Sequence, residues 1–154
     1  MSIDLSITLN NETKTLELAK KIALKINSGT LLYLSGELGA GKTAFVRGLI
    51  AELGFDGKIK SPSYSLVEQY RLDLHTINHF DLYRFKSPDE WIEAGFNEFI
   101  NGADINLIEW PEKGYPNLPT PDISMTWAHL DENKRNVLIR ANTDKGNKCI
   151  HDLI

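Results

Sequence analysis

Apolar residues recur along this chain with two different periods, which predicts that strands and helices alternate. Between residues 11 and 26, apolar side chains recur every three or four positions, as in an amphipathic helix. Residues 31–34 form a short, continuous apolar run, which is typical of a buried strand. Helical spacing returns in residues 46–53 and stops at Gly54, a usual helix end. The order helix, strand, helix predicts an α/β fold.

Several further runs predict strands that complete a sheet. They lie at residues 6–9, 64–70, 76–83, 105–109, 123–127 and 137–141. We expect the first to be an edge strand, the second and third to pair as a hairpin, and the last two to form a closing hairpin. Ser87-Pro88 predicts a helix start, because serine caps a helix and proline fits its first turn. The polar residues 143–154 predict a short, loosely tied C-terminal helix.

The loop between the strand at 31–34 and the next helix carries the strongest motif. Gly36-Glu37-Leu38-Gly39-Ala40-Gly41-Lys42-Thr43 fits G-x-x-x-x-G-K-[ST], the phosphate-binding pattern. Glycines let backbone N–H groups point at a phosphate, and the helix N-terminus adds partial positive charge. We expect Lys42 to reach the β- and γ-phosphates of a nucleotide and the Thr43 hydroxyl to ligate Mg²⁺. The alternative is a glycine turn that carries Lys-Thr by chance.

Two acids lie at or near the ends of predicted strands, where ligands gather in open α/β sheets. Glu109 ends the apolar run 105–109 and is expected to join the Mg²⁺ site. Asp81, in the segment His79-Phe80-Asp81, could hold Mg²⁺ indirectly, could orient the attacking water, or could be an exposed or arginine-paired carboxylate. We expect His79 to be a packed or surface histidine. The predicted catalytic residues are therefore Lys42, Asp81 and Glu109, and the predicted metal ligands are Thr43, Glu109 and Asp81.

Other side chains have a functional and a structural interpretation that the sequence leaves open. Ser61, Pro62, Ser63 and Ser65 could form a segment that senses the γ-phosphate through hydroxyls, or their hydroxyls could simply decorate a strand or turn. Trp110 could stack on the base or cover the edge of the core. Asn11 is expected to cap a helix, and a contact to the nucleotide is the alternative.

Composition indicates one domain spanning residues 1–154 and excludes several classes of protein. The apolar share of 42% and charged share of 25% are ordinary for a globular protein. We see no signal peptide and no apolar run long enough to cross a bilayer. The single cysteine, Cys149, fits a reducing compartment, and we expect a cytoplasmic location without membrane contact. The net charge of −4 disfavours a generic nucleic-acid binder, so any RNA contact is expected to run through a partner.

Four motifs together resemble one family. They are the loop 36–43, Ser61-Pro62-Ser63-Tyr64-Ser65-Leu66-Val67, His79-Phe80-Asp81-Leu82-Tyr83-Arg84 and Ile108-Glu109-Trp110-Pro111-Glu112. Their order and spacing are similar to those of the TsaE (YjeE) family, the small bacterial ATPases needed for N6-threonylcarbamoyladenosine (t6A) modification of tRNA. Ser63 stands where the family usually has threonine, and it keeps the hydroxyl. The resemblance covers most of the chain and weakens in about the last thirty residues.

The resemblance implies a single P-loop NTPase-like three-layer domain, with a mixed, mainly parallel sheet and a C-terminal hairpin. It implies Mg²⁺-dependent ATP binding and hydrolysis to ADP that is slow in isolation. It also implies work on the threonylcarbamoyl-transferase subunit and its inactive paralogue, of the TsaD and TsaB types, with ATP resetting that complex between turnovers. Lys42 and Thr43 would bind phosphate and Mg²⁺, Glu109 would join the metal, Asp81 would support hydrolysis, and Trp110 would lie at the nucleotide.

Two other functions remain open from the residues alone. A small-molecule P-loop kinase usually needs an arginine-bearing lid, whereas Arg71, Arg84, Arg135 and Arg140 are scattered along this chain. The sequence shows no obvious arginine finger of its own. The second alternative is a nucleotide-gated binding module, in which occupancy by the nucleotide alone controls docking to a partner. A GTPase is disfavoured because Asn147-Lys148 is followed by Cys149-Ile150 rather than by the guanine-recognition pattern.

Overall fold

The computed structural model describes residues 4–37 and 39–153, which share one seven-stranded sheet in the order β1-β7-β6-β2-β5-β4-β3. The strands are β1 (Asp4–Leu9), β2 (Leu31–Gly36), β3 (Val67–Arg71), β4 (Thr76–Asp81), β5 (Ile105–Glu109), β6 (Ile123–His129) and β7 (Arg135–Ala141). The β6·β2, β2·β5 and β5·β4 pairs are parallel, and the other three are antiparallel. Since β1 and β6 both oppose β7, five strands share one direction and only β3 and β7 run against it.

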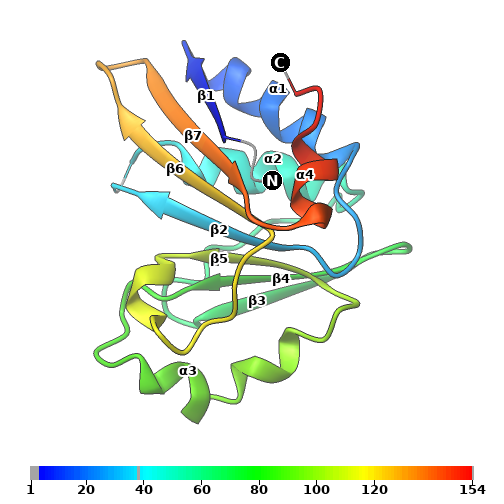
Figure 1. Ribbon diagram of the computed structural model, residues 1–154, viewed down its shortest axis with the longest axis vertical. Coiled ribbons are helices and arrows are strands. Elements are labelled where there is room, and N and C mark those ends of the chain that lie inside the picture. Colours follow the sequence, from blue (N-terminus) through cyan, green and yellow to red (C-terminus); the bar gives the residue numbers. More distant parts are fainter. Residues whose placement is uncertain (1–3, 38, 154) are drawn as a thin grey trace.

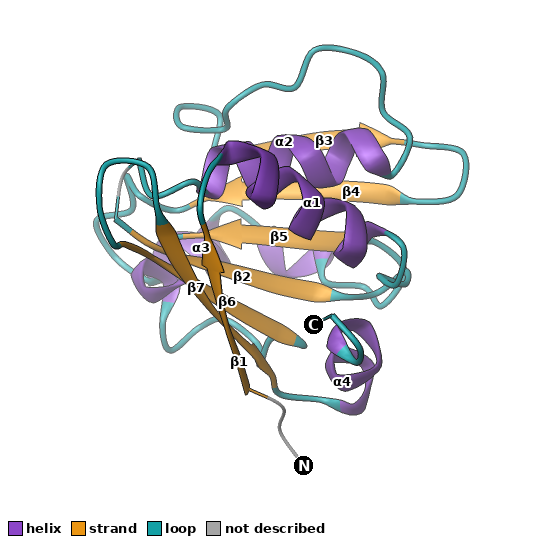
Figure 2. Ribbon diagram, turned by 90° about the horizontal axis from the view of Figure 1, so that it is seen from above, coloured by secondary structure: helices purple, strands orange, loops and turns teal. Residues whose placement is uncertain are grey.

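Helices cover both faces of this sheet, which gives three layers (Figures 1 and 2). The helices α1 (Glu12–Ala23) and α2 (Lys42–Glu52) pack on one face, over a core that also takes residues from α4 (Asp144–Ile150). The other face is covered by α3 (Asp89–Glu93) and by two short 3₁₀ helices, η1 (Phe96–Phe99) and η2 (Pro111–Gly114). The expected α/β architecture with a mixed, mainly parallel sheet and a C-terminal hairpin is confirmed.

The apolar run in β2 is continuous because this central strand is buried on both faces. Leu32 and Leu34 belong to the core beneath α1 and α2, whereas Leu31 and Tyr33 belong to the core beneath α3. Side chains that alternate along a strand point to opposite faces, so both faces here demand apolar residues. This burial anchors the strand from which the phosphate-binding loop departs.

Two segments differ from the expectation. The strand expected at 64–70 begins only at Val67, because Leu66 has φ = 72° and donates its N–H to the carbonyl of Pro62 at 2.8 Å, closing a turn. The C-terminal segment is packed more closely than a loosely tied tail. Cys149, Ile150 and Leu153 are buried against the core of α1 and α2. The apolar spacing of these three residues holds the segment against that core.

The sheet brings the ends of three neighbouring parallel strands together at one edge. In register, Glu109 of β5 lies opposite both Asp81 of β4 and Leu34 of β2. The loop that follows β2 leaves from this same edge. Parallel strands place their carboxyl ends together, so the loop 36–43 and both acids meet although they are distant in sequence.

Candidate functional site at the carboxyl edge of the sheet

The loop after β2 has a backbone that favours glycine at its bends. Gly36 has φ = 133° and Gly41 has φ = 106°. At Gly36, a Cβ atom would lie 2.4 Å from the carbonyl oxygen of Trp127, so a side chain cannot fit there without a backbone shift. Within the loop, the N–H of Ala40 donates to the carbonyl of Glu37 at 3.2 Å. Leu38 lies outside the described residues.

Lys42 is folded back over its own loop. The side chain is buried, with 4% exposed, and its ammonium donates a hydrogen bond to the carbonyl of Gly36 at 2.6 Å. The same nitrogen lies 4.1 Å from the ring centroid of Trp110. Burial lowers the pKa of Lys42, and the nearby carboxylates of Glu109, Glu112 and Asp81 oppose that shift. The ammonium is therefore held in place by a carbonyl and an aromatic ring, at the wall of a cavity.

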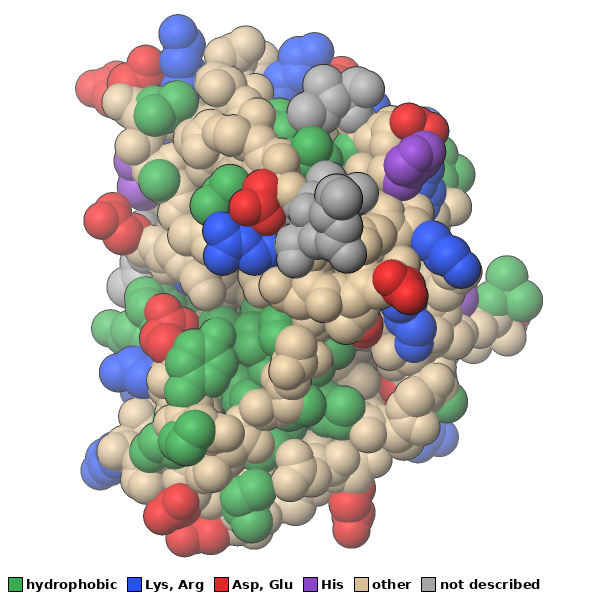
Figure 3. All heavy atoms as spheres, in the orientation of Figure 1, with side chains coloured by type: hydrophobic (Ala, Val, Ile, Leu, Met, Phe, Trp, Pro, Cys, Tyr) green, Lys and Arg blue, Asp and Glu red, His purple; other side chains and the backbone are tan. Residues whose placement is uncertain are grey.

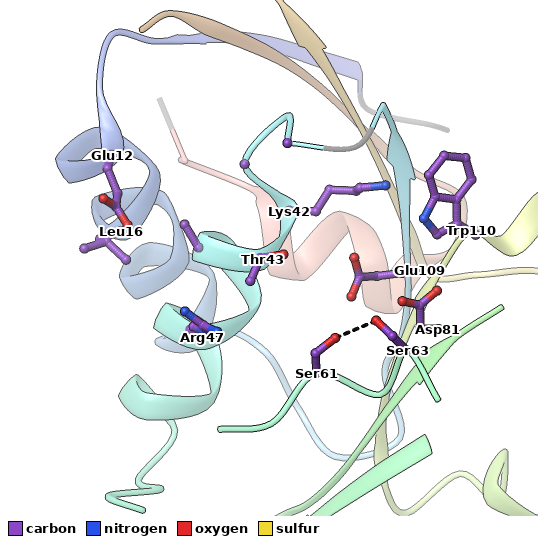
Figure 4. A pocket seen from close by; sticks show the side chains of 13 residues that line it. Glu12, Leu16, Lys42, Thr43, Arg47, Ser61, Ser63, Asp81, Glu109 and Trp110 are labelled. Atoms are coloured by element: carbon purple, nitrogen blue, oxygen red, sulfur yellow. Dashed lines mark hydrogen bonds between the residues drawn. The ribbon is translucent and has the colours of Figure 1, made fainter. Parts of the chain in front are cut away.

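A cavity of about 440 Å³ opens beside this lysine (Figure 4). Its walls come from the loop, α1, α2, the segment before β3 and the ends of β4 and β5. Of the predicted site residues, it gathers Gly39, Gly41, Lys42, Thr43, Ser61, Ser63, Asp81, Glu109 and Trp110. Glu37, Ala40, Pro62, Ser65 and Asn11 do not line it. The phosphate loop, both acids and part of the hydroxyl-rich segment thus face one space.

The two carboxylates are in different surroundings. Burial raises the pKa of Asp81 and the negative charge of Glu109 raises it further, while the backbone N–H of Tyr83, which donates to Oδ1 at 2.9 Å, works against the shift. Glu109 is buried, with 7% exposed, and its Oε2 lies 2.6 Å from Nε2 of His79. His79 is 4% exposed, so it is the packed residue that the sequence suggested, and it contacts an acid of the site.

The donor set suits a magnesium ion. Mg²⁺ prefers oxygen ligands and keeps several waters, binding through one or two carboxylates and the phosphates of a substrate. The hydroxyl of Thr43 and the carboxylates of Asp81 and Glu109 line the same cavity. Among the described residues, no group of three His, Cys, Asp or Glu side chains forms a self-sufficient metal site. These residues therefore fit Mg²⁺ that arrives with a nucleotide, rather than a metal caged by protein alone.

The hydroxyl-rich segment divides into a part that faces the cavity and a part that does not. Ser61 and Ser63 both line it, and their hydroxyl oxygens lie 2.8 Å apart (Figure 4). Ser65 instead donates to Glu68 at 3.3 Å and is exposed. Pro62 is buried, and its carbonyl accepts the turn-closing bond from Leu66. The direct contacts available to a ligand in this segment are those of Ser61 and Ser63.

Trp110 stands at the rim, between β5 and η2. It has φ = 57°, an uncommon value for a residue with a side chain. Its ring packs on Tyr83, with centroids 4.9 Å apart, and the Lys42 ammonium lies over the same ring. The indole is half-buried, so it covers the core edge while part of its surface still faces the cavity.

Asn11 has the capping role that the sequence predicted. Its Oδ1 accepts the N–H of Lys14 at 3.0 Å, at the start of α1. It lines a neighbouring cavity of about 210 Å³, together with Gly41 and Arg135, rather than the larger one. A contact between Asn11 and a nucleotide stays a prediction.

Two arginines that the sequence did not single out for the site lie at or beside it, and whether an arginine of this chain completes the phosphate site stays a prediction. Arg47 lines the cavity from α2, one helical turn after Thr43, and Arg135 donates to the carbonyl of Gly39 at 3.4 Å. Residues four apart share a helix face, so the spacing from Thr43 to Arg47 was the available signal. Glu12 and Leu16 of α1 also line the cavity, and no local pattern marked them.

A mixed α/β sheet with this strand–loop–helix unit, and a cavity at the carboxyl edge, defines a protein with the architecture of P-loop NTPases. The family described as "Threonylcarbamoyl adenosine biosynthesis protein TsaE" matches residues 9–137. A protein named tRNA threonylcarbamoyladenosine biosynthesis protein TsaE from Haemophilus influenzae is 40% identical over 145 residues, covering 91% of each chain. One of the same name from Rickettsia felis is 42% identical, over 90% of this chain and 81% of its own.

The three-dimensional comparison agrees. The crystal structure of YdiB from Bacillus subtilis superimposes with a TM-score of 0.82 at 25% sequence identity, covering 99% of this chain and 95% of that one. The chain belongs to the TsaE family, which is named for the biosynthesis of threonylcarbamoyladenosine in tRNA.

Proposed function

We propose that this protein is an Mg²⁺-dependent ATPase of tRNA t6A biosynthesis. It would bind and hydrolyse ATP to reset the threonylcarbamoyl-transferase complex, of the TsaD and TsaB types, between turnovers. The transfer itself would belong to the partner. The observation that carries the proposal is the single cavity that joins the phosphate loop, Thr43 and the strand-end acids Asp81 and Glu109. A cytoplasmic location follows from this role.

The roles of the residues follow from their positions. The loop N–H groups and the start of α2 would hold the phosphates, since a helix N-terminus carries partial positive charge. Lys42 would exchange its bond to the Gly36 carbonyl for one to a phosphate oxygen. Thr43, Glu109 and Asp81 are the residues that would hold Mg²⁺, which would supply positive charge to neutralise the phosphates. The carboxylate of Asp81 would also orient the water that attacks in line.

Contact with tRNA is proposed to run through the partner. The formal charge is −4, and on the face shown in Figure 3 the basic side chains lie scattered among acidic ones. A surface that grips the nucleic-acid backbone normally gathers Lys and Arg into a stripe or patch. In the described part of the chain, no helix is long and apolar enough to cross a membrane.

The test is ATP binding and hydrolysis by this chain, alone and with the transferase heterodimer. Lys42→Ala serves as the blank, and Lys113→Ala is the matched control, because Lys113 is exposed on η2 and does not line the cavity. We expect slow hydrolysis that rises sharply with the heterodimer, is lost in Lys42→Ala, and is kept in Lys113→Ala. Equal ATP binding by wild type and Lys42→Ala would overturn the proposal. A rate unchanged by the heterodimer would remove its partner-dependent half.

A further inference from the structure

The side chain of His79 is paired with Glu109 beneath the floor of the site. The two residues come from neighbouring parallel strands, β4 and β5, and Glu109 lies in register with Asp81, two residues after His79. Residues two apart on a strand share a face, so His79 and Glu109 meet on a diagonal. Their side chains are 5% and 10% exposed, and Nε2 of His79 lies 2.6 Å from Oε2 of Glu109.

This pair is a short, buried hydrogen bond to a carboxylate. In the described residues, His79 is the one side chain that hydrogen-bonds the carboxylate of Glu109, since Lys42 gives its hydrogen bond to the Gly36 carbonyl instead. A buried carboxylate is costly unless it is hydrogen-bonded, and bonds to charged groups are the stronger ones. The bond therefore restrains Oε2 of Glu109.

His79 lies behind Glu109 rather than at the wall of the larger cavity. It does not line the 440 Å³ cavity, whereas Glu109 does. It does line a small cavity of about 20 Å³ behind the site, together with Thr43 and Ser61. This placement is that of a residue which orients a metal-binding carboxylate from behind, a device that recurs in metal sites.

We infer that His79 is a positioning residue, which holds Glu109 in the orientation that receives Mg²⁺ with the nucleotide. The inference rests on the proposed function, because it names what sets the Mg²⁺ response of that same site. The inference predicts a selective effect on Mg²⁺-dependent binding. Loss of the His79 hydrogen bond should weaken the Mg²⁺-dependent part of nucleotide binding, whereas the contacts of the phosphate loop do not pass through His79.

The experiment is an Mg²⁺ titration of ADP binding, followed by calorimetry, on wild type, His79→Leu, His79→Gln and His79→Asn. Glutamine can place an N–H donor at a reach similar to that of Nε2, leucine has none, and asparagine is shorter. His75→Leu is the matched control, because His75 precedes the same strand at the opposite edge and bonds Ser28 at 2.9 Å.

We expect His79→Leu to raise the Mg²⁺ concentration for half-maximal ADP binding by about 10- to 100-fold, as for other residues that support metal ligands. ADP binding in EDTA should stay close to wild type, and His79→Gln should recover the wild-type Mg²⁺ response while His79→Asn does not. If His79→Leu fails to fold, the contrast between His79→Gln and His79→Asn carries the test.

An unchanged Mg²⁺ midpoint in His79→Leu, or identical behaviour of the glutamine and asparagine variants, would overturn the inference and leave the proposed ATPase intact. An equal loss of ADP binding with Mg²⁺ and in EDTA would also overturn it, since that is the result of a purely structural role. Failure of wild type to bind ADP under either condition would instead overturn the proposed function itself.

Discussion

The ammonium of Lys42 donates a hydrogen bond to the carbonyl oxygen of Gly36, six residues earlier, at a distance of 2.6 Å. The loop lysine thus closes on the residue at which its own loop begins. A phosphate that enters the loop competes with that carbonyl for the ammonium. Hydrogen bonds to charged groups contribute about 1.5–3 kcal/mol net, so this exchange is a measurable part of ligand binding.

Trp110 should report that exchange. The Lys42 ammonium lies 4.1 Å from the Trp110 ring centroid, so its movement onto a phosphate changes the surroundings of the indole. Trp91 and Trp127 are fully buried. We expect ADP to change the tryptophan emission of wild type, and Trp110→Phe to lose most of that change. Since a cation–π contact contributes about 0.5–2 kcal/mol and this contact is given up on binding, its loss should raise ADP affinity by less than about thirtyfold. An emission change of wild-type size in Trp110→Phe would show that the signal arises elsewhere.

Arg47 should contribute to the rate of hydrolysis. It lines the cavity one turn after Thr43, and it has no ion pair among the described residues. We expect Arg47→Ala to lower kcat by about 10- to 100-fold. Loss of a charge-stabilising donor can cost more than this in a buried site, but Arg47 is exposed. Single-turnover hydrolysis of labelled ATP gives the measurement, and Arg71→Ala, at the exposed edge strand β3, is the control. Equal rates for Arg47→Ala and Arg71→Ala would refute the role.

Asp81 should reduce the stability of the folded chain at neutral pH. Burial raises the pKa of its carboxyl, so the folded state favours the protonated form more than the unfolded state does. The ionised form therefore costs stability above both pKa values, and the cost vanishes below the ordinary aspartate value, about 4. We expect Asp81→Asn to unfold at higher urea than wild type at pH 7 and at equal urea near pH 3.

Asp131 provides a control, because the pKa of its carboxyl is shifted in the opposite direction. Backbone N–H groups of Lys134 and Asn133 lower the pKa of its exposed carboxyl, so its ionised form adds stability above the ordinary aspartate value and loses it as the pH falls through the lowered one. Asp131→Asn should therefore unfold at lower urea than wild type at pH 7. Shifts of the same sign in both variants would contradict the electrostatic explanation.

The thiol of Cys149 should be unreactive toward thiol reagents while the chain is folded. Burial raises the pKa of its thiol to about 12, from an ordinary 9.0, which lowers the thiolate fraction at pH 8 by about a thousandfold. We expect a thiol reagent to label native Cys149 at the rate of unfolding, and to label it at once in urea. Rapid labelling of the native chain would mean that α4 opens locally. The variant Leu153→Ala removes a buried side chain that follows α4, and it should accelerate the labelling of Cys149.

The sequence determined those parts of this protein that depend on local spacing. The pattern of apolar residues located the strands of the sheet and the helices α1 and α2, because side-chain direction repeats every two residues in a strand and every 3.6 in a helix. The pattern 36–43 located the phosphate loop, because glycines and a following helix suffice for its backbone. Glu109 and Asp81 were also found from local sequence, since each ends a recognisable strand.

The tertiary structure decided what depends on contacts between distant segments. The bond between His79 and Glu109 requires the register of β4 on β5, which no local pattern encodes. Arg47 shares a helix face with Thr43, but the cavity that both line is completed only by the distant segment of Ser61. The start of β3 at Val67 depends on the turn that Leu66 closes with Pro62. The packing of α4 depends on the core that α1 and α2 form with the sheet, which takes up Cys149 and Ile150. Each of these is set by the relative position of segments, which short-range periodicity leaves undetermined.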